Sequence, residues 1–95
     1  MKKVAYFRDG LVPEFVVRET VEDGKAVAEI WDYKAKKWVP DADAWETIED
    51  QRGNWSLDAD DVERYIQRML ERFPEIAEKN LEVKTEGAER KYPWW

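Results

Sequence analysis

The 95-residue sequence contains no cysteine and no histidine. The first absence excludes disulfides and thiolate metal sites, and the second removes the commonest metal ligand and the commonest general base. The only serine, Ser56, therefore has no histidine that could activate it as a nucleophile. We expect a protein that is not an enzyme and that has no cofactor and no metal site.

The sequence also lacks an apolar run that approaches the length of a membrane span, and no signal-peptide core follows the lysines near its start. Its net charge of −6 argues against a generic nucleic-acid binder, because such proteins bind largely by neutralising phosphates. These observations predict a soluble, cytoplasmic protein that makes no direct contact with nucleic acid or membrane.

Two hairpins are predicted in the first forty residues. Asp23-Gly24 is the strongest turn signal, because a type I′ turn requires positive φ at both central positions. A second turn after Tyr33 would bring Trp38 back beside Trp31, and Pro40 would end the sheet. The expected cross-strand pairs are Val17–Ile30, Arg18–Glu29, Trp31–Trp38, Ile30–Val39 and Asp32–Lys37.

Helices are predicted in the second half of the sequence. Asp43 with Glu46 resembles a capping box, although Asp41 is an equally good cap, and Gly53 is suited to end this short helix. Asp58 is the expected N-cap of a longer helix. Its apolar positions recur at three- and four-residue steps: Val62, Tyr65, Ile66, Met69, Leu70 and Phe73. Pro74 can open a final turn. Residues 81–84 are a candidate for a short additional strand.

Together these elements predict an α+β domain over residues 1–84. A meander sheet of three or four antiparallel strands would occupy residues 4–40, and two or three C-terminal helices would cover one of its faces. Trp45 and Trp55 would fill the edges of that layer as core residues. Residues 85–95 have no usable period and are predicted to form a flexible aromatic tail that could dock on the domain.

A sheet covered on one face leaves the other face open to water. That face would carry a partner-binding surface of Trp31, Trp38, Tyr33, Val16 and Arg18. Contiguous exposed aromatic patches usually mark interaction sites, and Trp, Tyr and Arg dominate interface energetics. The alternative is that the first strand, the tail or a second copy of the chain in a homodimer covers this face.

Charge is also segregated along the sequence. Residues 41–63 contain nine acids and one base, Arg52. Acids at helix N-termini offset the macrodipole, which explains Asp58, Asp60 and Asp61 but not Glu49 and Asp50, which come late in their helix. The second functional hypothesis is therefore an acidic surface, formed by Glu49, Asp50, Asp58, Asp60 and Asp61, that meets a basic partner.

The run "EIWDYKAKKWVPDADAW…GNWSLDADDVERYI" resembles small uncharacterised proteins of bacteria and their phages. These proteins combine a "WD…WV" hairpin with a following acidic-capped helix. The resemblance covers roughly residues 29–66 and implies the sheet-then-helix fold. It provides no catalytic residues, and it implies an accessory or host-directed role performed by binding.

The leading functional hypothesis is a small non-catalytic interaction module, of the kind found among phage or accessory proteins, that binds a host protein through the open aromatic face. The first alternative is an acidic inhibitor that imitates nucleic-acid charge. The second is a carbohydrate-binding or hydrolytic domain, because aromatic residues on sheets stack on sugar rings.

Overall fold

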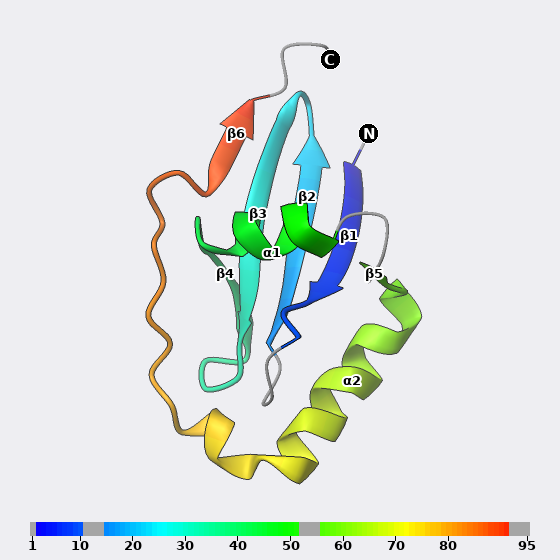
Figure 1. The fold of residues 1–95 in the computed structure, drawn as a ribbon, viewed down its shortest axis with the longest axis vertical. Helices are drawn as coiled ribbons and strands as arrows, with labels where there is room; N and C mark the ends of the chain where they lie inside the picture. Colours follow the sequence, from blue (N-terminus) through cyan, green and yellow to red (C-terminus); the bar gives the residue numbers. More distant parts are fainter. Residues whose placement is uncertain (1, 11–14, 52–55, 92–95) are drawn as a thin grey trace.

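The computed structural model describes residues 2–10, 15–51 and 56–91. In this part of the chain an antiparallel sheet is combined with two α-helices in an α+β arrangement (Figure 1). The strands are β1 (Lys2–Arg8), β2 (Val16–Glu22), β3 (Lys25–Asp32), β4 (Lys37–Pro40), β5 (Ser56–Leu57) and β6 (Glu89–Lys91). The helices are α1 (Ala44–Gln51), α2 (Ala59–Arg72) and the 3₁₀ turn η1 (Pro74–Ala77).

The hairpin of β2 and β3 has the predicted register. Asp23 and Gly24 adopt φ values of 52° and 75°, as a type I′ turn requires. Val17 consequently lies opposite Ile30, and Arg18 lies opposite Glu29. The turn residues thus fix which side chains of both strands share a face.

The hairpin of β3 and β4 is confirmed as well, with Trp31 opposite Trp38 and Asp32 opposite Lys37. The Asp32 carboxylate holds the connecting turn, because its Oδ1 accepts hydrogen bonds from the backbone N–H groups of Lys34 (3.0 Å) and Ala35 (3.1 Å). This side chain imitates a backbone turn, so the loop closes without a glycine.

The prediction of a flexible tail is wrong for residues 85–91, the part of the tail that the structure describes. β6 pairs with the first half of β3, with Lys25 opposite Lys91 and Val27 opposite Glu89. The ordered fold therefore extends beyond residue 84, and β4 and β6 occupy successive stretches of the same edge of β3. Residues 92–95 lie outside the described residues.

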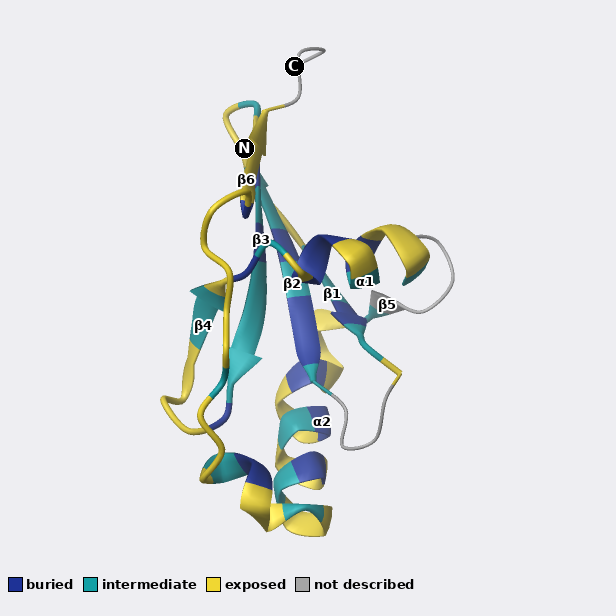
Figure 2. Cartoon of the chain, turned by 60° about the vertical axis from the view of Figure 1, so that its left-hand side comes forward, coloured by how far each residue is buried: buried dark blue, intermediate teal, exposed yellow. Residues whose placement is uncertain are grey.

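The prediction of one covered face and one open face is also wrong. α1 packs on the face formed by Phe7, Val17 and Ala28, whereas α2 packs on the opposite face, together with Val16 and Tyr33. The buried side of α1 adjoins the middle strands, and its outer side is exposed (Figure 2). The sheet is thus a middle layer with a hydrophobic cluster on each side.

Asp41 rather than Asp43 holds the start of α1. Its Oδ1 accepts hydrogen bonds from the N–H groups of Asp43 (3.2 Å) and Lys84 (3.1 Å), and the residue is buried. Residues 81–84 form no strand, but the connection from η1 to β6 runs outside β4 and is anchored by this carboxylate (Figure 1). One buried acid therefore joins two segments that are distant in the sequence.

The remaining helix predictions have mixed outcomes. Asp58 is the N-cap residue of α2, as predicted, but its side chain makes no capping hydrogen bond. Trp45 is a core residue, 2% exposed. The predictions for Gly53 and Trp55 concern positions outside the described residues.

Candidate binding groove between helix α2 and the sheet

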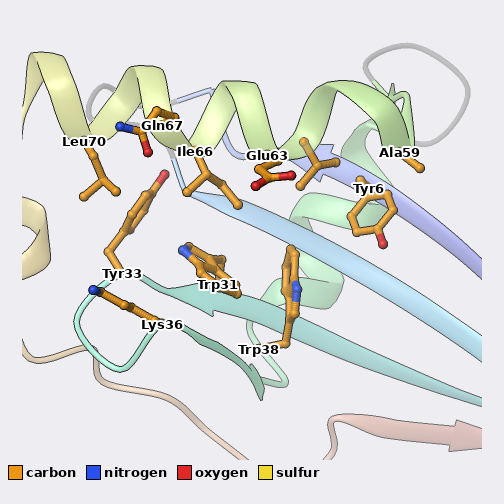
Figure 3. Close-up of a pocket in the computed structure, with 11 residues that line it drawn as sticks. Tyr6, Trp31, Tyr33, Lys36, Trp38, Ala59, Glu63, Ile66, Gln67 and Leu70 are labelled. Atoms are coloured by element: carbon orange, nitrogen blue, oxygen red, sulfur yellow. The ribbon is translucent and has the colours of Figure 1, made fainter.

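A groove with a volume of about 520 Å³ separates α2 from the sheet face that it covers (Figure 3). The floor is aromatic and consists of Tyr6, Trp31, Tyr33 and Trp38. The wall is formed by the apolar side of α2, with Val62, Ile66 and Leu70. The groove exists because α2 crosses only part of this face and leaves the two indoles half-buried.

The aromatic floor is held by ring contacts. The rings of Trp31 and Trp38 meet edge to face, with centroids 5.4 Å apart and an interplanar angle of 66°. The ring of Tyr6 also contacts Trp38, with ring centroids 5.8 Å apart. Such tilted arrangements are the favourable geometry for aromatic pairs, so the floor is formed before any ligand arrives.

Arg18 stabilises this floor from the adjacent strand. Its guanidinium carbon lies 4.5 Å from the centre of the Trp38 ring, and its Nε donates to Glu29 Oε1 at 2.8 Å. The ion pair holds the edge of the planar guanidinium, and the cation–π contact holds its position over the ring. Arg18 therefore orients Trp38 and does not line the groove.

The five predicted partner-binding residues have different positions. Trp31 and Trp38 are half-buried and line the groove. Val16 is fully buried, and Tyr33, although it lines the groove, is only 2% exposed, so neither offers the free surface that the open-face prediction required. Both lie within the cluster beneath α2, because that helix covers the face which the sequence interpretation left to solvent.

The rim of the groove carries the polar groups. Lys36 comes from the turn between β3 and β4, where it adopts a φ of 57°, and Glu63 and Gln67 come from α2. All three are exposed. An apolar floor with a polar rim is the usual anatomy of a protein interaction site.

The predicted acidic surface is divided by the sheet. Glu49 and Asp50 lie on α1, whereas Asp58, Asp60 and Asp61 lie at the start of α2, on the opposite face. All five are exposed, but Glu49 pairs with Arg90 and Asp61 pairs with Arg64. The charge segregation of the sequence therefore does not become one continuous surface.

Two wall residues were not singled out from the sequence. Ile66 and Leu70 were assigned only to the apolar side of the long helix, which is where they are found. The missed signal was the pair of tryptophans on the second sheet face, because large apolar residues on both faces indicate that both are covered. Tyr6 lies within residues 4–40, for which the sequence predicted the sheet, but it was given no functional role.

Within residues 2–10, 15–51 and 56–91, no group of three or more acidic side chains is arranged to hold a metal ion. Over the same ranges, no helix has both the length and the apolar character needed to cross a bilayer. No protein-family model, curated protein or solved structure matches this chain. The interpretation of the groove therefore depends on its own geometry.

Proposed function

We propose that the protein is a non-catalytic interaction module that binds a short apolar segment of a partner protein in the groove beneath α2. The observation that carries this proposal is the half-buried pair of Trp31 and Trp38 facing Ile66 across an open groove of about 520 Å³. Tryptophan in partly desolvated pockets is the residue type most enriched among interface hot spots. The resemblance to small bacterial and phage proteins favours a bacterial host protein as the partner.

The shape of the groove supports a chain segment as the ligand. Its wall runs along α2 from Ala59 to Leu70, which at 1.5 Å per residue is about 16 Å. An extended peptide of about five residues has that length. Because the described floor and wall are mainly apolar and the charged groups stand at the rim, apolar anchor side chains would enter and polar groups would stay outside.

The proposal can be tested with peptides selected against the protein from a random-sequence display library. We expect selected peptides with aromatic or aliphatic anchors to shift the indole resonances of Trp31 and Trp38 in ¹H–¹⁵N spectra. Trp45 provides an internal control, because it belongs to the cluster on the other face of the sheet and its Nε1–H donates to the carbonyl oxygen of Ala88. Peptides that shift Trp45 and leave Trp31 and Trp38 unchanged would contradict the proposal.

A matched pair of variants sharpens this test. Ile66→Ala shortens the groove wall and is expected to weaken peptide binding about tenfold, the effect of a moderate hot spot. Val83→Ala removes an exposed apolar side chain that does not line the groove and should change affinity less than about twofold. Equal effects of both substitutions would argue against the groove.

The alternatives differ in their response to salt and to sugars. A basic partner held by the acidic residues should dissociate as ionic strength rises, while a segment held in the apolar groove should respond little. A carbohydrate-binding or hydrolytic domain should respond to oligosaccharides, so an unchanged fluorescence across a broad panel would remove it. Light scattering would detect a homodimer in which one copy covers the groove of another.

A further inference from the structure

A second hollow lies on the other flank of α2, away from the groove. Its volume is about 330 Å³, and it is lined by Leu57, Tyr65 and charged residues of β1 and α2. The charged residues are Arg8, Arg64, Arg68 and Asp61. Three arginines against one aspartate give the lining a net charge of +2, although the whole chain has a net charge of −6.

The arginines reach the hollow from two elements. Arg8 ends β1, and its guanidinium carbon lies 5.7 Å from the centre of the buried Tyr65 ring. Arg64 and Arg68 are one helical turn apart on α2 and are both exposed. The packing of α2 against the end of β1 therefore gathers cations that are far apart in the sequence.

Internal ion pairs account for only part of this charge. Arg64 pairs with Asp61 at 3.1 Å, and both side chains of the pair are exposed. Within the described part of the chain, Arg68 has no carboxylate partner. Like charges at i and i+4 destabilise a helix, and Arg64 lies too early in α2 to gain from the macrodipole. A bound anion would remove this repulsion.

We propose that this hollow binds the phosphate group of a small molecule, through Arg68 and Arg64 with Arg8 at its edge. A guanidinium matches phosphate oxygens with two parallel N–H donors, and a phosphate monoester carries about −1.5 to −2 charges at pH 7. A phosphate monoester presents three acceptor oxygens, enough for contacts from both Arg64 and Arg68, whereas a carboxylate presents two. The volume leaves room for a second phosphate or part of an attached nucleoside.

The experiment uses pyrophosphate and adenosine triphosphate as probes, with sodium chloride of equal ionic strength as the reference. We expect both probes to shift the backbone resonances of Arg8, Tyr65 and Arg68. Arg68→Gln should weaken binding about tenfold, because it removes a bidentate charged contact. Arg68→Lys should weaken it less, because the charge is kept while the fork is lost.

Arg72→Gln is the matched control, because Arg72 is an exposed arginine of the same helix that does not line the hollow. It should change affinity less than about twofold if the hollow is the site. Tighter binding of the nucleotide than of pyrophosphate would identify a nucleotide as the source of the phosphate, and equal binding would identify the phosphate group alone. Shifts reproduced by sodium chloride, or equal losses in Arg68→Gln and Arg72→Gln, would overturn the proposal.

Discussion

Asp41 shows how one side chain can connect parts of this chain that are distant in the sequence. Its carboxylate accepts N–H groups from the start of α1 and from the connection to β6, and its own backbone N–H donates to the carbonyl oxygen of Ala28 at 3.0 Å. The residue thereby joins β3, α1 and the approach to β6. A buried carboxylate with two backbone donors has a structural role, which the sequence alone presented only as one of two possible caps.

Asp41→Ala should lower the free energy of unfolding by about 1–3 kcal/mol, because two partly buried N–H groups lose their acceptor. Asp43→Ala is the control, since Asp43 is exposed and was the competing candidate for the cap. Its expected effect is within about 0.5 kcal/mol. Urea unfolding of both variants measures the difference, and equal losses would show that Asp41 is not the anchoring carboxylate.

Among the strands and helices, β6 is the one whose own residues show the weakest sequence signal for a regular element. It is three residues long and entirely exposed, but its neighbourhood is tied to the α1 face. Arg90 forms an ion pair with Glu49 and lies 4.2 Å above the ring centre of Trp45, whose Nε1–H donates to Ala88. The strand is therefore held by its side chains as well as by its ladder with β3.

Arg90→Ala should destabilise the fold by about 0.5–1.5 kcal/mol, because it removes a cation–π contact together with an exposed ion pair. Lys91→Ala is the neighbouring control, with an expected change within about 0.5 kcal/mol. Hydrogen exchange of the Ala28 amide, which donates to Ala88 at 2.9 Å, reports the same contact locally. Unchanged exchange in Arg90→Ala would contradict this role of the side chain.

Elements defined by contacts between residues close in the sequence were predicted, whereas an element defined by distant contacts was missed. The two hairpins and their registers were predicted correctly, because Asp23-Gly24 and the paired tryptophans act within short stretches. α2 was predicted from its own apolar period. β6 was missed, because its partner β3 lies far away in the sequence and no turn signal connects the two.

At the scale of the whole molecule, a single sheet divides two hydrophobic clusters. Ile48 belongs to the cluster under α1, and Ile76 of η1 belongs to the cluster under α2. Both are nearly inaccessible to solvent, at 0% and 3% exposure. The sequence predicted the amphipathic helices but not the faces they cover, because the short connections permitted packing on either side.

Ile48→Val and Ile76→Val remove the same methylene group on opposite sides of the sheet. Each should cost about 0.5–1.5 kcal/mol, and the double variant should equal the sum within about 0.5 kcal/mol, because the two sites share no packing partner. Urea unfolding of the wild type, the two single variants and the double variant gives the four free energies of a double-mutant cycle. A coupling energy above about 1 kcal/mol would show that the sheet transmits strain between its faces.

The shared edge of β3 has a consequence for synthesis on the ribosome. β4 can pair with its half of that edge soon after the hairpin emerges, but the half opposite β6 has no partner until residues 89–91 have been translated. A nascent chain that stalls earlier exposes unpaired backbone N–H and C=O groups beside Ala26. Such an exposed strand edge can be bound by chaperones or can pair wrongly with another chain. Completion of the native ladder is therefore tied to the arrival of the last described strand.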